Sequence, residues 1–175
     1  MTTSSQNTTP LLRGERSELL HALSEQRELL LITVRGITDA QAAQRTTASD
    51  LTLGGIVKHL TRGEQVWMQI MVEGDGGLPE GMLDMGQYGM TDDETLPGLL
   101  KQYAAAARTT ERAVTDLRDL DRSVPLPSTP WSPPETVYWS ARRILLHLIR
   151  ETAQHAGHAD IIRESLDGAS TTARR

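Results

Sequence analysis

The last third of the chain carries a row of side chains that could bind a metal ion. The row consists of His147, Glu151, His155 and His158, separated by steps of four, four and three residues. Those steps place all four side chains along one face of a single helix. A polar row beside a core-facing stripe costs free energy unless its members bond to something. A divalent cation suits a carboxylate and imidazoles as a partner, so the row predicts a metal site.

Three residues make the best ligand set. Glu151 and His155 lie one helical turn apart, and side chains at that spacing can converge on one ion. The third ligand must come from another segment, and His59 is the candidate because apolar Ile56 and Leu60 flank it on its own predicted helix. Two histidines and one carboxylate leave coordination positions open, as in catalytic zinc and non-haem iron(II) sites. The chain has no cysteine, which excludes thiolate ligands and disulfides. Zinc is the expected ion, with nickel, iron and manganese as alternatives.

Several of these residues also have interpretations that need no metal. His158 could support the ligands, donate a proton, or be a satisfied polar side chain. His147 could belong to an internal hydrogen-bond network or ligate directly. Glu151 and His155 could form an ordinary exposed helix pair. His21, among charged neighbours, is predicted to be a surface histidine.

Other residues near the predicted site have structural interpretations. Trp67 and Trp139 are expected to anchor the core or a loop rather than serve as ligand platforms. The Arg142–Arg143 pair is expected on a solvated face. Gly63, one turn after His59, leaves room around the histidine.

The elements that must position these residues are helices. Apolar residues recur at spacings of three and four along four segments. These are expected at about residues 14–35, 52–72, 91–117 and 136–166. Thr38 and Gln41 have the spacing of a capping box that opens one short helical turn, and Thr91 and Glu94 have it at the third long helix. No stretch shows sustained strand alternation, so the predicted fold class is all-α, a four-helix bundle.

Two long loops interrupt this pattern, one between the second and third long helices and one between the third and fourth. Residues 74–89 are rich in glycine, and residues 119–134 are rich in proline. Long loops inside a domain are often functional, and the first is expected to shape the mouth of the pocket. The domain prediction is a disordered lead-in at 1–10, one bundle domain at 11–168, and a frayed tail at 169–175.

Composition limits the partners. The formal net charge is −5, with both signs spread along the chain and no basic patch, which argues against nucleic acid. No apolar run approaches the roughly 20 residues that a membrane span needs, and the first residues lack the apolar segment of a signal peptide. The protein is therefore expected in the cytoplasm, without a membrane partner.

Two segments resemble the DinB-like superfamily. They are LTLGGIVKHLTRGEQVW at residues 51–67 and WSARRILLHLIRETAQHAGHADIIRESLDG at residues 139–168. The closer resemblance is to a branch of small actinobacterial proteins related to mycothiol-dependent maleylpyruvate isomerase. It implies a four-helix bundle with up-down-down-up connectivity, often dimeric. It also implies a divalent metal held by one histidine of the second long helix and two residues one turn apart on the last. The isomerase branch has Glu then His there, which matches Glu151 and His155, and His59 falls on the remaining position.

The resemblance also implies an activity. Proteins of the superfamily catalyse thiol-dependent isomerisation or transfer low-molecular-weight thiols such as mycothiol or bacillithiol. The leading hypothesis is a metal-dependent thiol S-transferase or isomerase that acts on a small electrophile, with mycothiol as cosubstrate and a homodimer as the assembly. Such an enzyme needs no cysteine, because the cosubstrate supplies the sulfur. The alternatives are a non-catalytic metal- or small-molecule-binding bundle linked to stress, and a bundle used mainly for dimerisation without metal.

Overall fold

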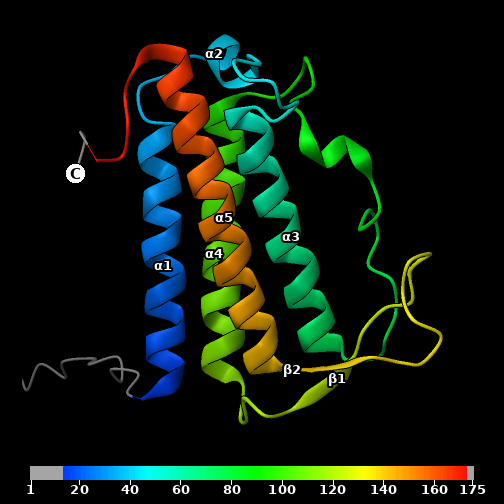
Figure 1. Cartoon of the computed structure of the whole chain (residues 1–175). Coiled ribbons are helices and arrows are strands. Elements are labelled where there is room, and N and C mark those ends of the chain that lie inside the picture. The colour runs from blue at the N-terminus through cyan, green and yellow to red at the C-terminus, as the bar shows by residue number, and fades with distance from the viewer. Residues whose placement is uncertain (1–13, 173–175) are drawn as a thin grey trace, which may run out of the picture.

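Four long helices lie side by side in the computed structural model, which describes residues 14–172 (Figure 1). They are α1 (Glu15–Thr33), α3 (Leu53–Glu73), α4 (Leu96–Asp116) and α5 (Ala141–Asp167). Along the bundle axis, α1 and α5 run in one direction and α3 and α4 in the other (Figure 1). The all-α prediction and the up-down-down-up order are therefore confirmed. The predicted lead-in at 1–10 and the last three residues of the predicted tail lie outside the described residues.

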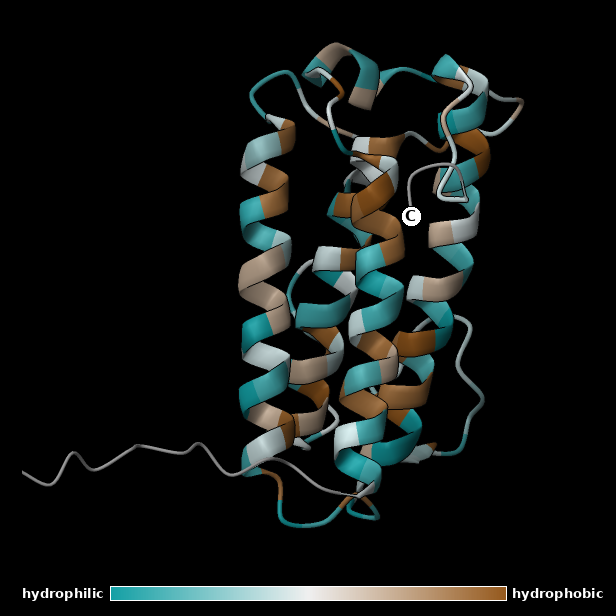
Figure 2. Cartoon of the chain, turned by 90° about the vertical axis from the view of Figure 1, so that its left-hand side faces the viewer, coloured by the Kyte–Doolittle hydropathy of each residue, from teal (hydrophilic) through white to brown (hydrophobic). Residues whose placement is uncertain are grey.

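The helices bury their apolar stripes in two clusters. Hydrophobic and hydrophilic positions alternate along the long helices, as amphipathic helices require (Figure 2). One cluster is centred on Leu30, Ile56 and Leu99, and the other on Leu23, Met71 and Ile144. The main helix contacts are α1 with α5, α3 with α4, and α3 with α5. No helix within residues 14–172 combines the length and the apolar character that a membrane crossing demands.

A buried polar cluster lies inside the bundle. It consists of Arg27 of α1, Glu64 of α3 and Thr110 of α4, all nearly inaccessible to solvent. Arg27 forms an ion pair with Glu64, and the Thr110 hydroxyl donates to the same carboxylate at 2.5 Å. On each helix the polar residue falls between the residues of the two apolar clusters. We call this the inner cluster.

The start of α3 is fixed by its cap and by two glycines. The Thr52 hydroxyl accepts from the Gly55 amide, which caps the helix. A Cβ at Gly54 would lie 2.0 Å from the Met90 sulfur, and one at Gly55 would lie 2.3 Å from the Tyr88 carbonyl oxygen. Because the Tyr88 carbonyl is backbone and cannot move aside, position 55 requires glycine for the loop before α4 to pack against this end of α3.

The same loop is tied down one turn later on α3. The Lys58 ammonium donates to the Gly89 carbonyl at 3.1 Å and to Glu94 at 2.9 Å. The loop contains a 3₁₀ turn, η1 (Met85–Tyr88), which the sequence did not predict. These contacts place η1 beside His59, the next residue of α3.

The predicted start of α4 was wrong. The helix begins at Leu96 and is capped by Thr95, whose hydroxyl accepts from the Gly98 amide. A helix from Thr91 would place Pro97 in its interior, where proline lacks a donor and clashes with the preceding turn. Starting at Leu96 leaves Pro97 in the first turn, where proline is tolerated.

The predicted start of α5 was also wrong. Residues 138–140 form β2 (Tyr138–Ser140), which pairs in antiparallel fashion with β1 (Ser123–Pro125). α5 therefore begins at Ala141, where the Ser140 hydroxyl accepts from the Arg143 amide. Strands of three residues are too short to show alternation, so the sequence pattern missed them. The short helix α2 (Asp39–Ala43) is capped by Thr38 and Gln41 as predicted.

Arg142 does not lie on a free solvated face. Its guanidinium bonds Glu15 at the start of α1, with Nε–Oε1 at 2.5 Å and Nη2–Oε2 at 3.0 Å, and it also pairs with Asp121 before β1. Both carboxylates raise the pKa of Arg142, and its hydrogen bonds lower the pKa of Glu15. The residue thus joins three segments at one end of the bundle.

Candidate metal centre

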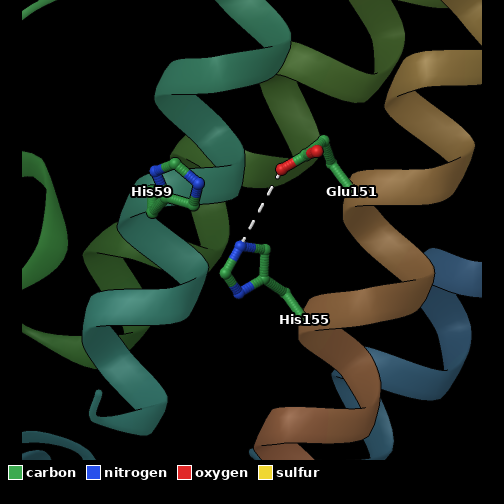
Figure 3. A group of neighbouring side chains, drawn as sticks. All are labelled: His59, Glu151 and His155. Carbon is green, nitrogen blue, oxygen red and sulfur yellow. Dashed lines mark ion pairs between the residues drawn. The ribbon is translucent and has the colours of Figure 1, made fainter. Parts of the chain in front are cut away.

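His59, Glu151 and His155 converge between two helices. One ligand atom from each of the three lies within 4.8 Å of the others. His59 extends from α3 and the other two from α5, and all three point toward one another (Figure 3). The His59 and His155 ring centroids are 4.9 Å apart, and His155 Nε2 lies 4.0 Å from Glu151 Oε2. The structure therefore brings together the three residues that the sequence singled out, from positions far apart in the chain.

The antiparallel course of α3 and α5 sets this arrangement. His59 faces His155, and two turns further along α3 the Trp67 ring lies 4.5 Å from that of His147. Gly63 falls midway on α3, and Glu151 falls midway on α5. Because side chains four residues apart share a helix face, these six residues form three successive facing pairs. We call them the α3–α5 seam.

The orientation of His59 is set by η1. Its Nδ1 lies 3.4 Å from Gln87 Oε1, and its ring stacks on Tyr88 with centroids 4.6 Å apart. A proton on Nδ1 satisfies the amide oxygen and leaves the Nε2 lone pair for a cation. Loop contacts of this kind fix both the tautomer and the ring plane of a metal-binding histidine.

The environments of the His59 and His155 imidazoles both favour the neutral form of the ring. Burial lowers the pKa of His59, although Gln87 and Glu151 oppose the shift. Burial also lowers the pKa of His155 to about 4, aided by the neighbouring His59 and His158 rings and opposed by Glu151. Metal ions bind the unprotonated imidazole, so these environments prepare both rings for coordination at neutral pH.

The three residues do not satisfy one another. The 4.0 Å between His155 Nε2 and Glu151 Oε2 exceeds hydrogen-bond length. His155 Nδ1 is buried and has no hydrogen-bond partner among residues 14–172. Two neutral imidazoles and a carboxylate aimed at one point are the donor set of open zinc and iron sites. The residues present therefore fit a divalent cation.

Arg150 holds the carboxylate from the solvent side. Its Nη2 donates to Glu151 Oε1 at 3.0 Å and lies 2.8 Å from His147 Nδ1. Burial lowers the pKa of His147, Arg150 lowers it further, and Glu151 opposes the shift. A neutral His147 can accept from the guanidinium through Nδ1. His147 thus bonds to the exposed Arg150 rather than joining the internal network expected for it, and it lies outside the converging group of three.

An aromatic cluster closes one end of the seam. Trp67 stacks on Trp139 with ring centroids 5.0 Å apart and planes within 5°, and His147 lies edge-on to both. The Arg143 guanidinium covers Trp139 at 4.4 Å from the ring centre. Both tryptophans pack against the second apolar cluster, which confirms that they anchor the core. Arg143 is exposed as expected. It also stacks on Trp139, a contact that the local sequence does not predict.

His158 and His21 lie outside the converging group. The His158 ring is edge-on to that of His155 at 5.3 Å, and its Nδ1 is buried without a hydrogen-bond partner in the described part of the chain. Its support or proton-transfer role stays a prediction. His21 is exposed on α1, 3.6 Å from Glu25.

The loop at residues 74–89 lines a cavity of about 620 Å³ between that loop, α3 and α4. The lining is polar and includes Lys58, Arg62, Gln65 and Gln102. Gln87 lines this cavity and also contacts His59, whereas none of the three converging residues lines it. The loop therefore contributes to the site through η1 rather than by enclosing a pocket over it.

Sequence reasoning missed Gln87, Tyr88 and Arg150. The first two lie in a loop that only its length indicates as functional, and nothing in its residues indicates contact with His59. The sequence does indicate a role for Arg150, because this residue directly precedes Glu151 and lies three residues after His147, within reach of both side chains.

Comparison with known proteins identifies the family and the fold. The family model described as mycothiol-S-transferase matches residues 18–168. None of the curated proteins matches. Among solved structures, a conserved protein from Enterococcus faecalis has a TM-score of 0.67 at 14% identity, covering 90% of this chain and 100% of that one. That likeness concerns the fold alone. The family match spans all four long helices and both halves of the seam, and the chain belongs to the mycothiol S-transferase family of DinB-like proteins.

Proposed function

We propose that this chain binds one divalent cation through His59, Glu151 and His155 and transfers a mycothiol-type thiol onto a small electrophile. The observation that carries the proposal is the approach of the three ligand atoms to within 4.8 Å, in a member of the mycothiol S-transferase family. Zinc is the expected ion, because the donor set is two imidazoles and one carboxylate with positions left open.

The chemistry needs an acidified thiol. A divalent cation held there supplies positive charge that lowers the pKa of a thiol brought to it. The chain's residues prepare that place: η1 fixes the His59 ring through Gln87, and Arg150 holds the Glu151 carboxylate. Since the chain has no cysteine, the reacting sulfur comes from the cosubstrate.

The reaction also needs a destination for the thiol proton. The His158 and His155 ring centroids are 5.3 Å apart. His158 Nδ1 is buried and has no hydrogen-bond partner among residues 14–172. We propose that His158 takes this proton and passes it to water. Replacing His158 by Ala should then slow turnover and leave the bound metal in place.

The test is thiol transfer by the purified full chain. With mycothiol and 1-chloro-2,4-dinitrobenzene, a carbon–sulfur bond forms as the carbon–chlorine bond breaks, and chloride and a proton are released. We expect metal-dependent chloride release that is lost in His155→Ala and retained in His21→Ala, whose side chain is exposed on α1. Stoichiometric metal without thiol consumption above background would reject the transfer activity and favour the non-catalytic binding bundle.

A further inference from the structure

Gly63 occupies a position in α3 that no contact within residues 14–172 explains. It is half-buried in the middle of the helix, and a Cβ built on it would meet nothing within 4 Å. Its φ is not among the positive glycine values, so any residue could adopt its backbone conformation. A glycine inside a helix is destabilising relative to alanine. The chain therefore keeps open space here at a cost in stability.

The other two glycines of α3 differ in this respect. A Cβ at Gly54 or Gly55 would collide with the loop before α4, at 2.0 Å from Met90 and 2.3 Å from Tyr88. Close packing within the chain accounts for both. At Gly63 no part of the described chain fills the space, so the space is available to a molecule from outside.

This open space lies in the middle of the α3–α5 seam. The His59 and His155 rings bound it at one end with centroids 4.9 Å apart, and the Trp67 and His147 rings bound it at the other end at 4.5 Å. Each end is one helical turn from Gly63, about 6 Å along the axis. The space therefore lies directly beside the three converging residues, and Glu151 of α5 faces Gly63 across it.

We propose that the open space at Gly63 is the binding site for the electrophile, a small, flat, largely apolar molecule with one polar acceptor. Aromatic walls favour a flat ligand that stacks or packs edge-on. Across the space, Arg150 neutralises Glu151 and presents a guanidinium that can bond a nitro or carbonyl oxygen. The assignment rests on the proposed function for its chemical role, and the binding itself can be measured without turnover.

The chain offers a matched control in Gly157. It also lies in a long helix with nothing within 4 Å of a built Cβ, but it is exposed on α5 and faces away from the seam. Replacing either glycine by alanine should raise the Tm by about 2–4 °C through helix propensity alone. Only Gly63→Ala should affect the electrophile.

The experiment is titration of metal-loaded protein with 1-chloro-2,4-dinitrobenzene in the absence of thiol, followed by quenching of tryptophan fluorescence. Trp67 bounds the space, so a nitroaromatic bound there should quench saturably. One methyl group more or less in a ligand site changes binding about 10-fold or more. We therefore expect Gly63→Ala to raise Kd about 10-fold and Gly63→Val to raise it further, while Gly157→Ala matches the wild type and all variants keep one metal per chain.

Three results would overturn the assignment: no saturable quenching by the wild type, equal affinity in the Gly63 variants, or loss of metal in Gly63→Ala. If Gly63→Val does not fold, Gly63→Ala alone decides. Saturable binding that is lost in Gly63→Ala supports the site even if mycothiol transfer is absent, and in that case only the proposed function fails.

Discussion

α3 presents two polar clusters on different faces, and each contains a carboxylate. In the inner cluster, Glu64 is paired with Arg27 and accepts from Thr110. In the seam, Glu151 lies among two neutral imidazoles, and its cationic partner is the largely exposed Arg150. The inner cluster balances its charge from within the chain. In the seam, by contrast, the imidazole and carboxylate lone pairs of His59, His155 and Glu151 converge, and the chain does not supply a hydrogen-bond donor for all of them.

This difference indicates which cluster awaits a ligand. The Arg27 and Glu64 side chains are 6% and 4% exposed, whereas Glu151 is 28% exposed. Each cluster holds a buried nitrogen without a hydrogen-bond partner among residues 14–172, Arg27 Nε in one and His155 Nδ1 in the other. The contrast therefore rests on charge: the inner cluster pairs its charges, whereas the lone pairs of the seam converge without a buried cation. We infer that the inner cluster serves the fold and the seam serves function, and the following changes should separate the two.

The largest effect on stability is expected from the inner cluster. Glu64→Gln keeps the shape of the side chain but leaves the buried Arg27 charge with only the half-exposed Glu111 carboxylate, 3.7 Å away, as a counter-charge. Removing one partner of a buried ion pair costs about 3–5 kcal/mol. Denaturant unfolding of the variant should show a loss of that size, while metal analysis still finds one ion per chain.

The control replaces both partners. Arg27→Met combined with Glu64→Leu removes the charges together and should recover much of the lost stability. If Glu64→Gln instead released the metal while leaving unfolding unchanged, the division between the two clusters would be wrong.

A smaller effect is expected from the residue that orients His59. Gln87→Leu removes the acceptor 3.4 Å from His59 Nδ1 and keeps a side chain of similar size. Loss of such a supporting partner costs about 10–100-fold in metal affinity. Competition with a chelator should detect this change, and Gln69→Leu, on the exposed face of α3, should leave the affinity unaltered. Equal metal affinity in both variants would show that η1 does not support metal binding.

The smallest effect concerns pH and the metal-free protein. Burial holds the pKa of His155 at about 4 in the folded state, against about 6.5 when unfolded. The folded state then binds fewer protons in this window, so stability should fall as pH drops from about 6.5 toward 4. Urea unfolding of chelator-treated protein across this range should show the decline, and His155→Gln should flatten it. An equal slope in the variant would assign the pH dependence to other groups.

The sequence was sufficient for the features that depend on short-range spacing. Glu151 and His155 are one turn apart, and that spacing alone places them on one face. The ends of α1, α3 and α5 near Gly36, Gly74 and Gly168 follow from local glycine chemistry, and two of these residues cap their helices in the left-handed conformation. The choice of His59 needed only its apolar flanks and the expectation that two helices pack.

The remaining features depend on contacts between distant residues. Gln87 reaches His59 from a loop whose backbone packs directly on Gly55 of α3. Arg142 meets Glu15 across a sequence separation of 127 residues, which the local pattern around Arg142 and Arg143 cannot indicate. β1 and β2 form because two short segments meet at the end of the bundle. Each has too few residues to show the alternation that predicts a strand.

The central claim is that His59, Glu151 and His155 hold one cation, and metal analysis with anomalous scattering tests it directly. Protein purified without a tag or chelator should contain one divalent ion per chain, with an anomalous peak between these three side chains. His155→Ala should lose the ion, and His21→Ala, which changes an exposed histidine on α1, should keep it. An ion-free wild type, or a His155→Ala protein that still binds one ion per chain, would contradict the account.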